Sequence, residues 1–393
     1  MLKLGRALHT YGYPAHGLEE ALTAVSTRLG LRTQFFSAPT ALFASFGNEE
    51  EQKTFQVRVD PGGVNLEKLA LLDDVAAEVA RGSLQAGEGA LRVDAIVAKP
   101  PPYGPLLTTL SFGLASGSAS RFFGGGWQEI AASAAIGLAI GLLAMAAERF
   151  PAMGRAFEPA AATLAALLAT AAAAKAGPVS VYITTVAGLI VLIPGFTLTV
   201  AMTELATRNL VSGTARLVGA CGTFLAIGFG VALGTTVGER LLGRAPVSQA
   251  QVLPDWTLWA ALLLAPLSFT VLLRAQERDT FWIVVSGVLG YSGARVGADL
   301  LGPELGAFVG ALVVGVGGNA YARWIGRPAA VTIVPGILLL VPGSIGFRSF
   351  ASLLEQQTVL GVESAFRMTL VAISLVTGLL FANIVLSPRR AAP

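Results

Sequence analysis

Two proline–glycine pairs lie inside long apolar stretches of the sequence. Leu192-Ile193-Pro194-Gly195 matches Leu340-Val341-Pro342-Gly343 at an offset of 148 residues. Proline removes one backbone donor and glycine loosens the chain, so each pair is expected to interrupt a helix and free carbonyl groups. Interrupted backbone at membrane depth persists where it lines a cavity. There, a half-helix N-terminus can hold a carboxylate, and freed carbonyls can hold an ammonium group or a coupling cation. We therefore expect a binding site at the two breaks.

Hydroxyl side chains accompany both breaks and extend the expected site. The substrate-binding set consists of Pro194, Gly195, Thr197, Thr199, Pro342, Gly343 and Ser344. An ordinary kink is the alternative interpretation, because proline kinks are common in membrane helices. Recurrence of the pair in a second copy favours the binding site.

Charged residues near or within apolar segments are the second group of candidates. Glu204 and Arg216 match Glu355 and Arg367 at an offset of 151 residues, and Asp299 lies at the end of another apolar segment. Burying a charge in lipid costs several kcal/mol, so such residues are functional candidates by default. We expect Glu204, Glu355 and Asp299 to take part in proton coupling. The alternative for Arg216 and Arg367 is an interfacial loop position.

The composition defines the environment in which these residues must be positioned. Apolar residues make up 54% of the chain and charged residues 13%, with a mean hydropathy of +0.67, whereas soluble domains are about 25% charged. Of the 51 charged residues, 22 lie in residues 1–103. The chain therefore consists of two unlike regions, and neither is basic enough for a nucleic-acid binder. Cys221 is the only cysteine and His9 and His16 are the only histidines, so no metal or other cofactor is expected.

Residues 1–103 are predicted to form a small α/β domain. An amphipathic helix pair is expected up to Leu29, followed by strands at 34–36, 41–46 and 54–59, a helix at 65–81 and a last strand at 91–97. The set His9, His16, Glu19 and Glu20 could be imagined as a hydrolytic or metal site, but surface polar groups on the helix pair are the favoured interpretation. The first residues lack a secretory signal, which predicts a cytoplasmic domain.

Residues 104–388 contain ten apolar segments long enough to be membrane helices. They are expected near 106–122, 128–147, 159–176, 179–203, 214–237, 256–274, 281–297, 305–322, 330–347 and 365–387. The matching breaks predict two five-helix repeats, at 104–245 and 246–393. Because five is odd, the repeats must cross the membrane in opposite directions, as in many secondary transporters. Ten arginines on the N-domain side, against seven basic residues on the other, agree with a cytoplasmic N-terminus and C-terminus.

Several stretches resemble the threonine/serine exporter family, ThrE, in its fused form with both five-helix blocks. They are Leu4-Gly-Arg-Ala-Leu-His-Thr-Tyr-Gly-Tyr-Pro-Ala-His16, Ile193-Pro-Gly-Phe-Thr-Leu-Thr199, and Leu210-Val-Ser-Gly-Thr-Ala-Arg-Leu217. The resemblance covers nearly the whole chain. It implies proton-motive-force-dependent efflux of threonine and serine across a bacterial cytoplasmic membrane. Ser212 and Arg216, within the third stretch, join the expected substrate-binding residues.

Three functional hypotheses remain open at this point. The first is a proton-coupled exporter of small hydroxy amino acids, with protons and membrane lipid as its other partners. The second is a dicarboxylate exporter of the same architecture, for which Arg216, Arg348 and Arg367 would supply positive charge. The third is a membrane-anchored hydrolase acting through the N-domain, although a Gly-x-Ser-x-Gly nucleophile motif is lacking. Glycines spaced four apart allow close helix packing and could support a homodimer.

Overall fold

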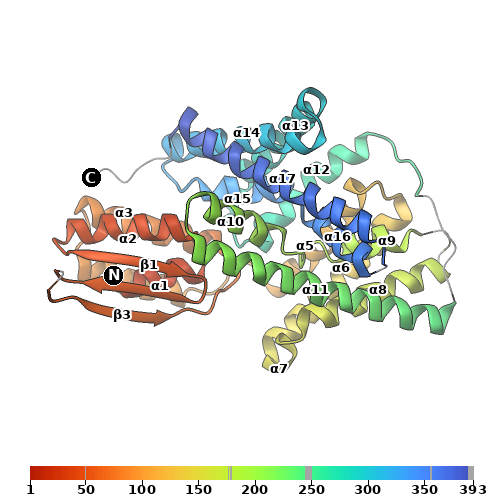
Figure 1. Ribbon diagram of the computed structural model, residues 1–393, viewed down its shortest axis with the longest axis horizontal. Helices are drawn as coiled ribbons and strands as arrows, with labels where there is room; N and C mark the ends of the chain where they lie inside the picture. The colour runs from red at the N-terminus through yellow and green to blue at the C-terminus, as the bar shows by residue number, and fades with distance from the viewer. Residues whose placement is uncertain (49, 176, 178, 244–249, 355, 388–393) are drawn as a thin grey trace.

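The computed structural model describes the chain except residues 49, 176, 178, 244–249, 355 and 388–393. Figure 1 shows an α/β domain at one end and a larger helical region beside it. A stretch of three prolines at 100–102 joins the two regions and leads directly into the first long helix.

The N-terminal domain packs four helices against a three-stranded sheet. Its elements are α1 (Leu2–Thr10), α2 (Ala15–Arg28), β1 (Thr33–Ala38), β2 (Ala41–Phe46), β3 (Lys53–Arg58), α3 (Leu66–Arg81) and α4 (Ala86–Ala98). The sheet is antiparallel in the order β1-β2-β3, with Ala38 opposite Ala41. Leu8, Leu18 and Leu22 from the first two helices are fully buried in the core beside Leu42. The expected strands and helices up to Arg81 are confirmed.

The expected last strand at 91–97 is wrong, because this segment belongs to helix α4. Gly89 and Val93 are the buried positions of α4, and their spacing of four places them on one helical face. That face packs against Val75 and Val79 of α3. The β-branched residues of the segment favoured a strand in isolation, but packing on α3 requires the helical spacing.

The helical region divides into two successive blocks. The first contains α5 (Pro105–Phe122), α6 (Trp127–Arg149), α7 (Pro151–Gly154), α8 (Phe157–Lys175), α9 (Val181–Gly188), α10 (Gly195–Ala206) and α11 (Leu210–Leu242). The second contains α12 (Trp256–Leu272), the short turn η1 (Glu277–Asp279), α13 (Thr280–Leu301), α14 (Pro303–Ile325), α15 (Ala330–Leu338), α16 (Gly343–Leu354) and α17 (Thr358–Val385). Within the described residues, seven helical segments are long and apolar enough to cross a membrane. The chain is thus a polytopic α-helical membrane protein.

Equivalent positions of the two blocks make equivalent contacts. Ser133 donates a hydrogen bond to the Thr184 carbonyl, and Ser286 donates one to the Thr332 carbonyl. A methyl group added at Gly230 would overlap the carbonyl oxygen of Pro159. One added at Gly378 would in the same way overlap the carbonyl oxygen of Phe308. The repeat detected in the sequence is therefore also a repeat of packing.

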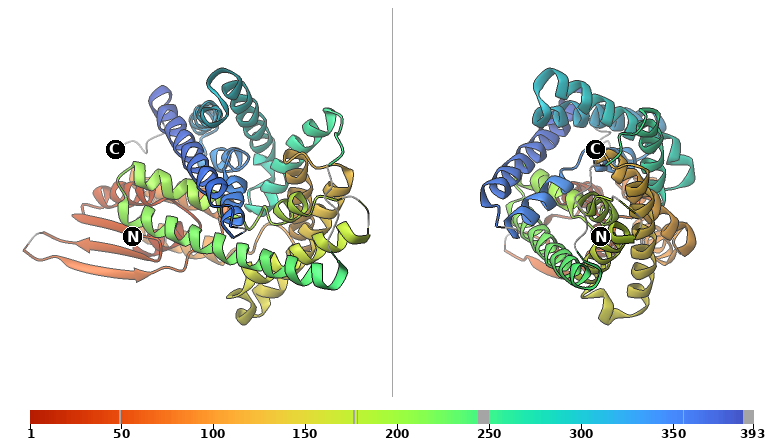
Figure 2. Two further views of the ribbon diagram at one scale, coloured as in Figure 1. Left: turned by 45° about the vertical axis from the view of Figure 1, so that its right-hand side comes forward. Right: turned by 90° about the vertical axis from the view of Figure 1, so that its right-hand side faces the viewer.

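The first helices of the two blocks, α5 and α12, lie side by side and run in opposite directions. Tyr103, just before α5, donates a hydrogen bond of 2.7 Å to the Ala275 carbonyl, just after α12. At the other ends, Arg121 donates one of 2.7 Å to the Thr257 hydroxyl. Figure 1 also shows that α11 begins, and α17 ends, near the N-terminal domain. In the end-on view of Figure 2, the interrupted segments lie within a ring of longer helices.

Candidate functional site

Both proline–glycine pairs interrupt their helices as the sequence predicts. Residues 189–194 separate α9 from α10, and residues 339–342 separate α15 from α16. Pro194 and Pro342 each precede the first residue of the following helix, where a missing amide donor costs nothing. Their carbonyls accept the first helical hydrogen bonds, from Leu198 at 3.0 Å and from Gly346 at 2.9 Å.

The two breaks touch each other at the centre of the helical region. A Cβ atom added at Gly195 would lie 3.1 Å from the Gly343 Cα, and one added at Gly343 would lie 3.3 Å from the Gly195 Cα. The same added atoms would collide with the side chains of Val341 and Ile193, which are themselves equivalent in the repeat. Only glycine permits an approach this close, so the two breaks form one mutual contact.

The contact between the breaks is closed and mainly apolar in this structure. Ile193 belongs to a buried cluster that includes Phe224 and Phe347. Thr199 is buried and its hydroxyl donates to the Gly195 carbonyl at 3.2 Å, whereas Thr197 and Ser344 are half-buried. The expected substrate-binding residues of both breaks therefore lie close together, but around a packed contact instead of an open polar pocket.

Glu204 is the centre of a second, charged site at the far end of α10. Its fully buried carboxylate accepts hydrogen bonds from the Ser212 hydroxyl at 2.8 Å and from the Arg216 Nε at 3.0 Å. A third donor is the backbone amide of Ala15, the first residue of α2 in the N-terminal domain, at 3.1 Å. Three donors and one opposite charge compensate the burial of this carboxylate.

The local sequence explains how α10 and α11 build this site. The chain turns at Arg208, which has a positive φ of 64°, and the Asn209 amide donates to the Glu204 carbonyl at 2.7 Å. Helix α11 then begins at Leu210 and runs back beside α10. Ser212 and Arg216 are four residues apart, so both face the preceding helix and reach the same carboxylate.

The N-terminal domain contributes further ionisable groups beside Glu204. His9 is buried, and its Nε2 lies 2.8 Å from the Ala38 carbonyl while its Nδ1 has no hydrogen-bond partner. Burial lowers the pKa of His9 below 6.5, and the nearby Arg216 acts in the same direction. Burial also raises the pKa of Glu19, whose carboxylate accepts from the Ser37 amide and feels the charge of Glu204.

The four residues considered for hydrolytic or metal chemistry do not form a set in the described structure. Glu20 is exposed, and Glu19 is engaged with the backbone of β1. The side chain of His16 lies outside the described residues. Throughout the described parts of the chain, no group of three or more His, Cys, Asp or Glu side chains could hold a metal ion.

The second block has no buried counterpart of the Glu204 site among its described residues. Arg367 pairs with Glu304 at 3.0 Å, and both side chains are accessible. Glu355, expected to couple protons, lies outside the described residues. Asp299, expected in the same role, is exposed near the end of α13.

One buried charge cluster was missed by the sequence analysis. Asp279 is buried at the start of α13, where it accepts a hydrogen bond from Tyr321 at 2.9 Å and pairs with Arg327. The sequence did contain one sign of this site: Asp279 directly precedes an apolar run, and an acidic residue at that position is favourable at a helix N-terminus. The partner arginine is 48 residues away, so the sequence alone did not reveal the pair.

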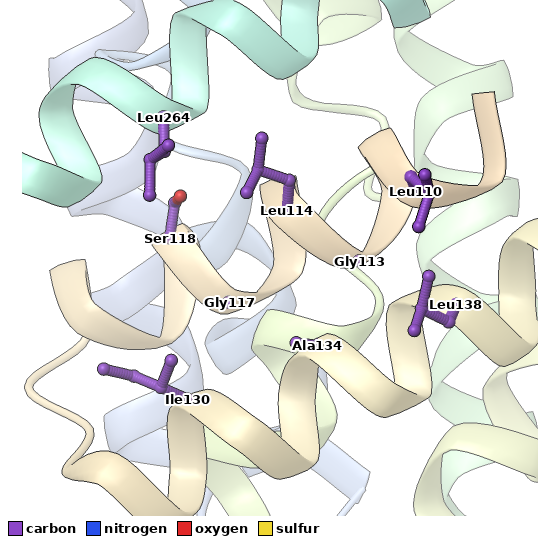
Figure 3. Close-up of a pocket in the computed structure, with 9 residues that line it drawn as sticks. All are labelled: Leu110, Gly113, Leu114, Gly117, Ser118, Ile130, Ala134, Leu138 and Leu264. Atoms are coloured by element: carbon purple, nitrogen blue, oxygen red, sulfur yellow. The ribbon is translucent and has the colours of Figure 1, made fainter. Parts of the chain in front are cut away.

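Two surface hollows of the structure lie away from both sites. One hollow, of about 300 Å³, lies between α5, α6 and α12, and Figure 3 shows its lining residues, which include Gly113, Gly117 and several leucines. The other lies beside Arg367 and Glu304, between α14 and α17. The first is almost wholly apolar, as expected for a surface that contacts lipid chains.

Two successive helical blocks, each with an interrupted helix, define the chain as a polytopic α-helical membrane protein. The sequence profile described as "Putative threonine/serine exporter" matches residues 1–238, and the profile described as "Threonine/Serine exporter, ThrE" matches residues 258–385. The chain therefore belongs to the threonine/serine exporter family, in the form that carries both blocks.

The curated relatives that the chain matches are longer fungal proteins. The pheromone-regulated membrane protein 10 of Pichia sorbitophila is 28% identical over 94% of this chain, and that of Eremothecium gossypii is 28% identical over 89%. An uncharacterised protein of Schizosaccharomyces pombe is 26% identical over 90%. The alignments span 38%, 48% and 44% of these relatives, respectively. No solved structure matches the chain.

Proposed function

We propose that the protein is a secondary active exporter of small hydroxy amino acids, threonine and serine, driven by the proton-motive force. The direct contact between the Pro194–Gly195 and Pro342–Gly343 breaks is the observation that carries this proposal. Transporters with inverted repeats bind substrate where discontinuous helices of the two repeats meet. Membership of the exporter family supports the same assignment.

The chemistry of the breaks suits a zwitterion with a hydroxyl group. Helices α10 and α16 both begin at the contact, so the positive ends of their dipoles can hold a carboxylate. The half-broken segments before them can offer carbonyls to an ammonium group. Thr197 and Ser344, half-buried beside the contact, can exchange hydrogen bonds with a substrate hydroxyl. In the proposed cycle the closed contact separates to admit the substrate.

The antiparallel arrangement of α5 and α12 supports the proposal that the two blocks are inverted repeats. With five crossings in each block, the total would be ten. Inverted repeats can exchange conformations, which exposes a central site to one side of the membrane and then to the other. We place the N-terminal domain and the end of α17 on the cytoplasmic side of a bacterial cytoplasmic membrane.

Glu204 is the proposed proton carrier of the first block. Its carboxylate is fully buried and its partners are a hydroxyl, an amide and one arginine, so a proton taken up there would release Arg216. Freed Arg216 could then pair with a substrate carboxylate. Protonation of Glu204 and binding of a substrate carboxylate by Arg216 would thus both require that the Glu204–Arg216 ion pair is broken.

Dicarboxylate export would use the same architecture but needs unpaired positive charge near the breaks. Arg216 is engaged by Glu204, and Arg367 by Glu304. These ion pairs reduce the cationic charge available for a second carboxylate, which favours a zwitterionic substrate. Competition between threonine and succinate for uptake into inverted vesicles compares the two candidates directly.

The proposal is tested with purified protein in liposomes carrying an imposed proton gradient. We expect labelled threonine and serine to move only while the gradient is present, and a protonophore to abolish the movement. Glu204→Gln should remove the dependence on the gradient. If neither amino acid moves under any gradient, the assigned substrate is wrong. If Glu204→Gln transports with the same gradient dependence, the proton is carried elsewhere.

A further inference from the structure

The N-terminal domain contacts both helical blocks at the same end of the molecule. On the first block, the amide of Ala15 at the start of α2 donates to Glu204. On the second block, the amides of Leu66 and Glu67 at the start of α3 donate to the carbonyls of Leu273 and Arg274, at 2.9 and 3.1 Å. One domain therefore spans two blocks that must change their relative position in an alternating-access cycle.

The first contact joins a negative charge to the positive end of a helix. Ala15 is the first residue of a 14-residue helix, so its amide has no partner within the helix. The Glu204 carboxylate satisfies this amide and lies where the helix dipole favours an anion. Ala15 is almost completely buried, which shows that the contact is closed to water.

The second contact joins the unpaired ends of two helices to each other. The first amides of α3 pair with the carbonyls that follow the end of α12, so each helix satisfies the other. Around these bonds, Leu66 packs with Ala275 and Ile283 in a buried apolar cluster. Ala70, Tyr321 and Val331 form another such cluster. Ionisable groups also border this contact: Tyr321 donates to the buried Asp279, which pairs with Arg327, and Glu67 pairs with Lys99.

We propose that the N-terminal domain is a gate that closes its side of the transporter, and that the Glu204 carboxylate is the latch that protonation releases. The inference rests on the proposed function and deepens it, because it assigns Glu204 a mechanical as well as a proton-carrying role. A proton on a Glu204 oxygen removes the charge that holds both the start of α2 and Arg216. The domain then swings from the first block while the contact of α3 with the end of α12 serves as the hinge.

Some of the groups that face Glu204 stabilise its ionised carboxylate and others destabilise it. Arg216 on α11 stabilises its ionised form, and so does the Ala15 amide. Glu19 on α2 opposes it as a like charge. His9 on α1 is uncharged without its proton, and protonated His9 would be repelled by Arg216 and attracted by Glu204. A proton on Glu204 weakens the latch, whereas a proton on Glu19 removes a repulsion from the Glu204 carboxylate and a proton on His9 acts in both directions.

The latch is tested by labelling a cysteine placed under it, without any transport measurement. Ala15→Cys, in a chain with Cys221→Ser, keeps the backbone amide and places a thiol in the closed contact. Lys53→Cys, exposed on β3, is the matched control, and the ratio of the two maleimide rates removes the intrinsic pH dependence of the thiol. We expect the ratio to rise at least fivefold from neutral to acid pH. With Glu204→Gln added, the ratio should be high at every pH. A ratio unchanged by both pH and Glu204→Gln would overturn the latch.

The gate is tested by locking α2 onto the first block, because the hinge contact on α12 is expected to persist. Ala15→Cys combined with Ser212→Cys places two thiols on either side of Glu204, and a short bis-methanethiosulfonate reagent joins them through two disulfides with release of methanesulfinate. A Ser45→Cys/Thr54→Cys pair, whose hydroxyls lie 2.8 Å apart within the sheet, is the control for cross-linking inside the domain. Since Ser212→Cys alters the site, transport is compared before cross-linking, after it, and after reductive release.

Cross-linking the two thiols of the Ala15→Cys/Ser212→Cys protein should lower the transport rate at least tenfold, and reduction should restore the rate. The cross-link within the sheet should leave the transport rate unchanged. Transport that continues at the same rate in the locked protein would overturn the gate. Absence of threonine transport in the parent protein, without the two substitutions, would instead refute the proposed substrate. In that case the labelling ratio still decides whether Glu204 holds the domain.

Discussion

Arg216 and Arg367 occupy matching positions of the two blocks but lie in opposite environments. Arg216 is 19% exposed and pairs with a Glu204 that is 0% exposed, while Arg367 is 54% exposed and pairs with a Glu304 that is 29% exposed. The N-terminal domain covers the first pair and leaves the second uncovered. The same sequence signal thus gives a buried ion pair or a surface ion pair, depending on an element from outside the repeat.

The comparison also distinguishes two environments within the helical region. Near the N-terminal domain, a titratable carboxylate is sealed between three segments of the chain. At the second block's pair, a hollow opens to the surface beside Arg367. The N-terminal domain contributes a donor to the first environment and none to the second, so it accounts for this difference between the two pairs.

The largest expected effect is the loss of stability when one partner of the buried pair is removed. Glu204→Ala leaves Arg216 without its counter-charge, and we expect a cost of about 3–5 kcal/mol. Glu304→Ala, which breaks the exposed pair, should cost about 0–1 kcal/mol. Unfolding in detergent compares the two variants with the parent protein. The double variant Glu204→Ala/Arg216→Ala should recover much of the loss, since no lone charge remains. Equal costs for the two single variants would contradict the difference in burial.

A smaller effect is expected where the blocks do match, at the contact of the two breaks. Gly195→Val and Gly343→Val both force a side chain into the opposite break, and each should cost about 1–3 kcal/mol and abolish transport. Gly222→Val on α11 is the control, because no atom lies within 4 Å of its added Cβ. If only one of the two glycines proved sensitive, the contact would not be mutual in the working protein.

The smallest effect concerns the pH dependence that His9 gives to the N-terminal domain. Burial lowers its pKa below the ordinary value of 6.5, so the folded chain binds fewer protons than the unfolded chain in that interval. Stability should therefore decrease as pH falls through 6.5 toward the lowered pKa, and level off beneath it. One site contributes at most about 1.4 kcal/mol per pH unit. His9→Gln should flatten this part of the curve when unfolding is followed between about pH 5 and 8. Parallel curves for the two proteins would show that His9 does not titrate there.

Much of the fold could be predicted from apolar run length and local signals. The interruption at Pro194 and Pro342 follows from proline's missing donor, and the helix at 66–81 follows from Asn65, whose side chain caps it, and from Gly82, which ends it at a positive φ of 76°. The segment 86–98 could not be predicted in the same way. Its own residues suit a strand, and only the neighbouring surface of α3 makes it a helix.

The candidate site was predictable in its residue types but not in its contacts. Glu204, Ser212 and Arg216 are close in the sequence and follow from helical spacing across one turn. The amide of Ala15 is 189 residues away from Glu204 and has no side-chain signal at all. The pairing of Asp279 with Arg327 could not be predicted for a similar reason, because two partners far apart in the chain produce no regular spacing in the sequence.

The sequence by itself determined that this chain is a repeated helical membrane protein with broken helices, because hydrophobic length and backbone chemistry act within a few neighbouring residues. Only the tertiary structure decided that the two breaks touch and that the N-terminal domain covers one block and not its copy. Those outcomes depend on how distant surfaces fit together. Close packing at Gly195 and Gly343, and the burial of Glu204 under α2, arise only when the whole chain is folded.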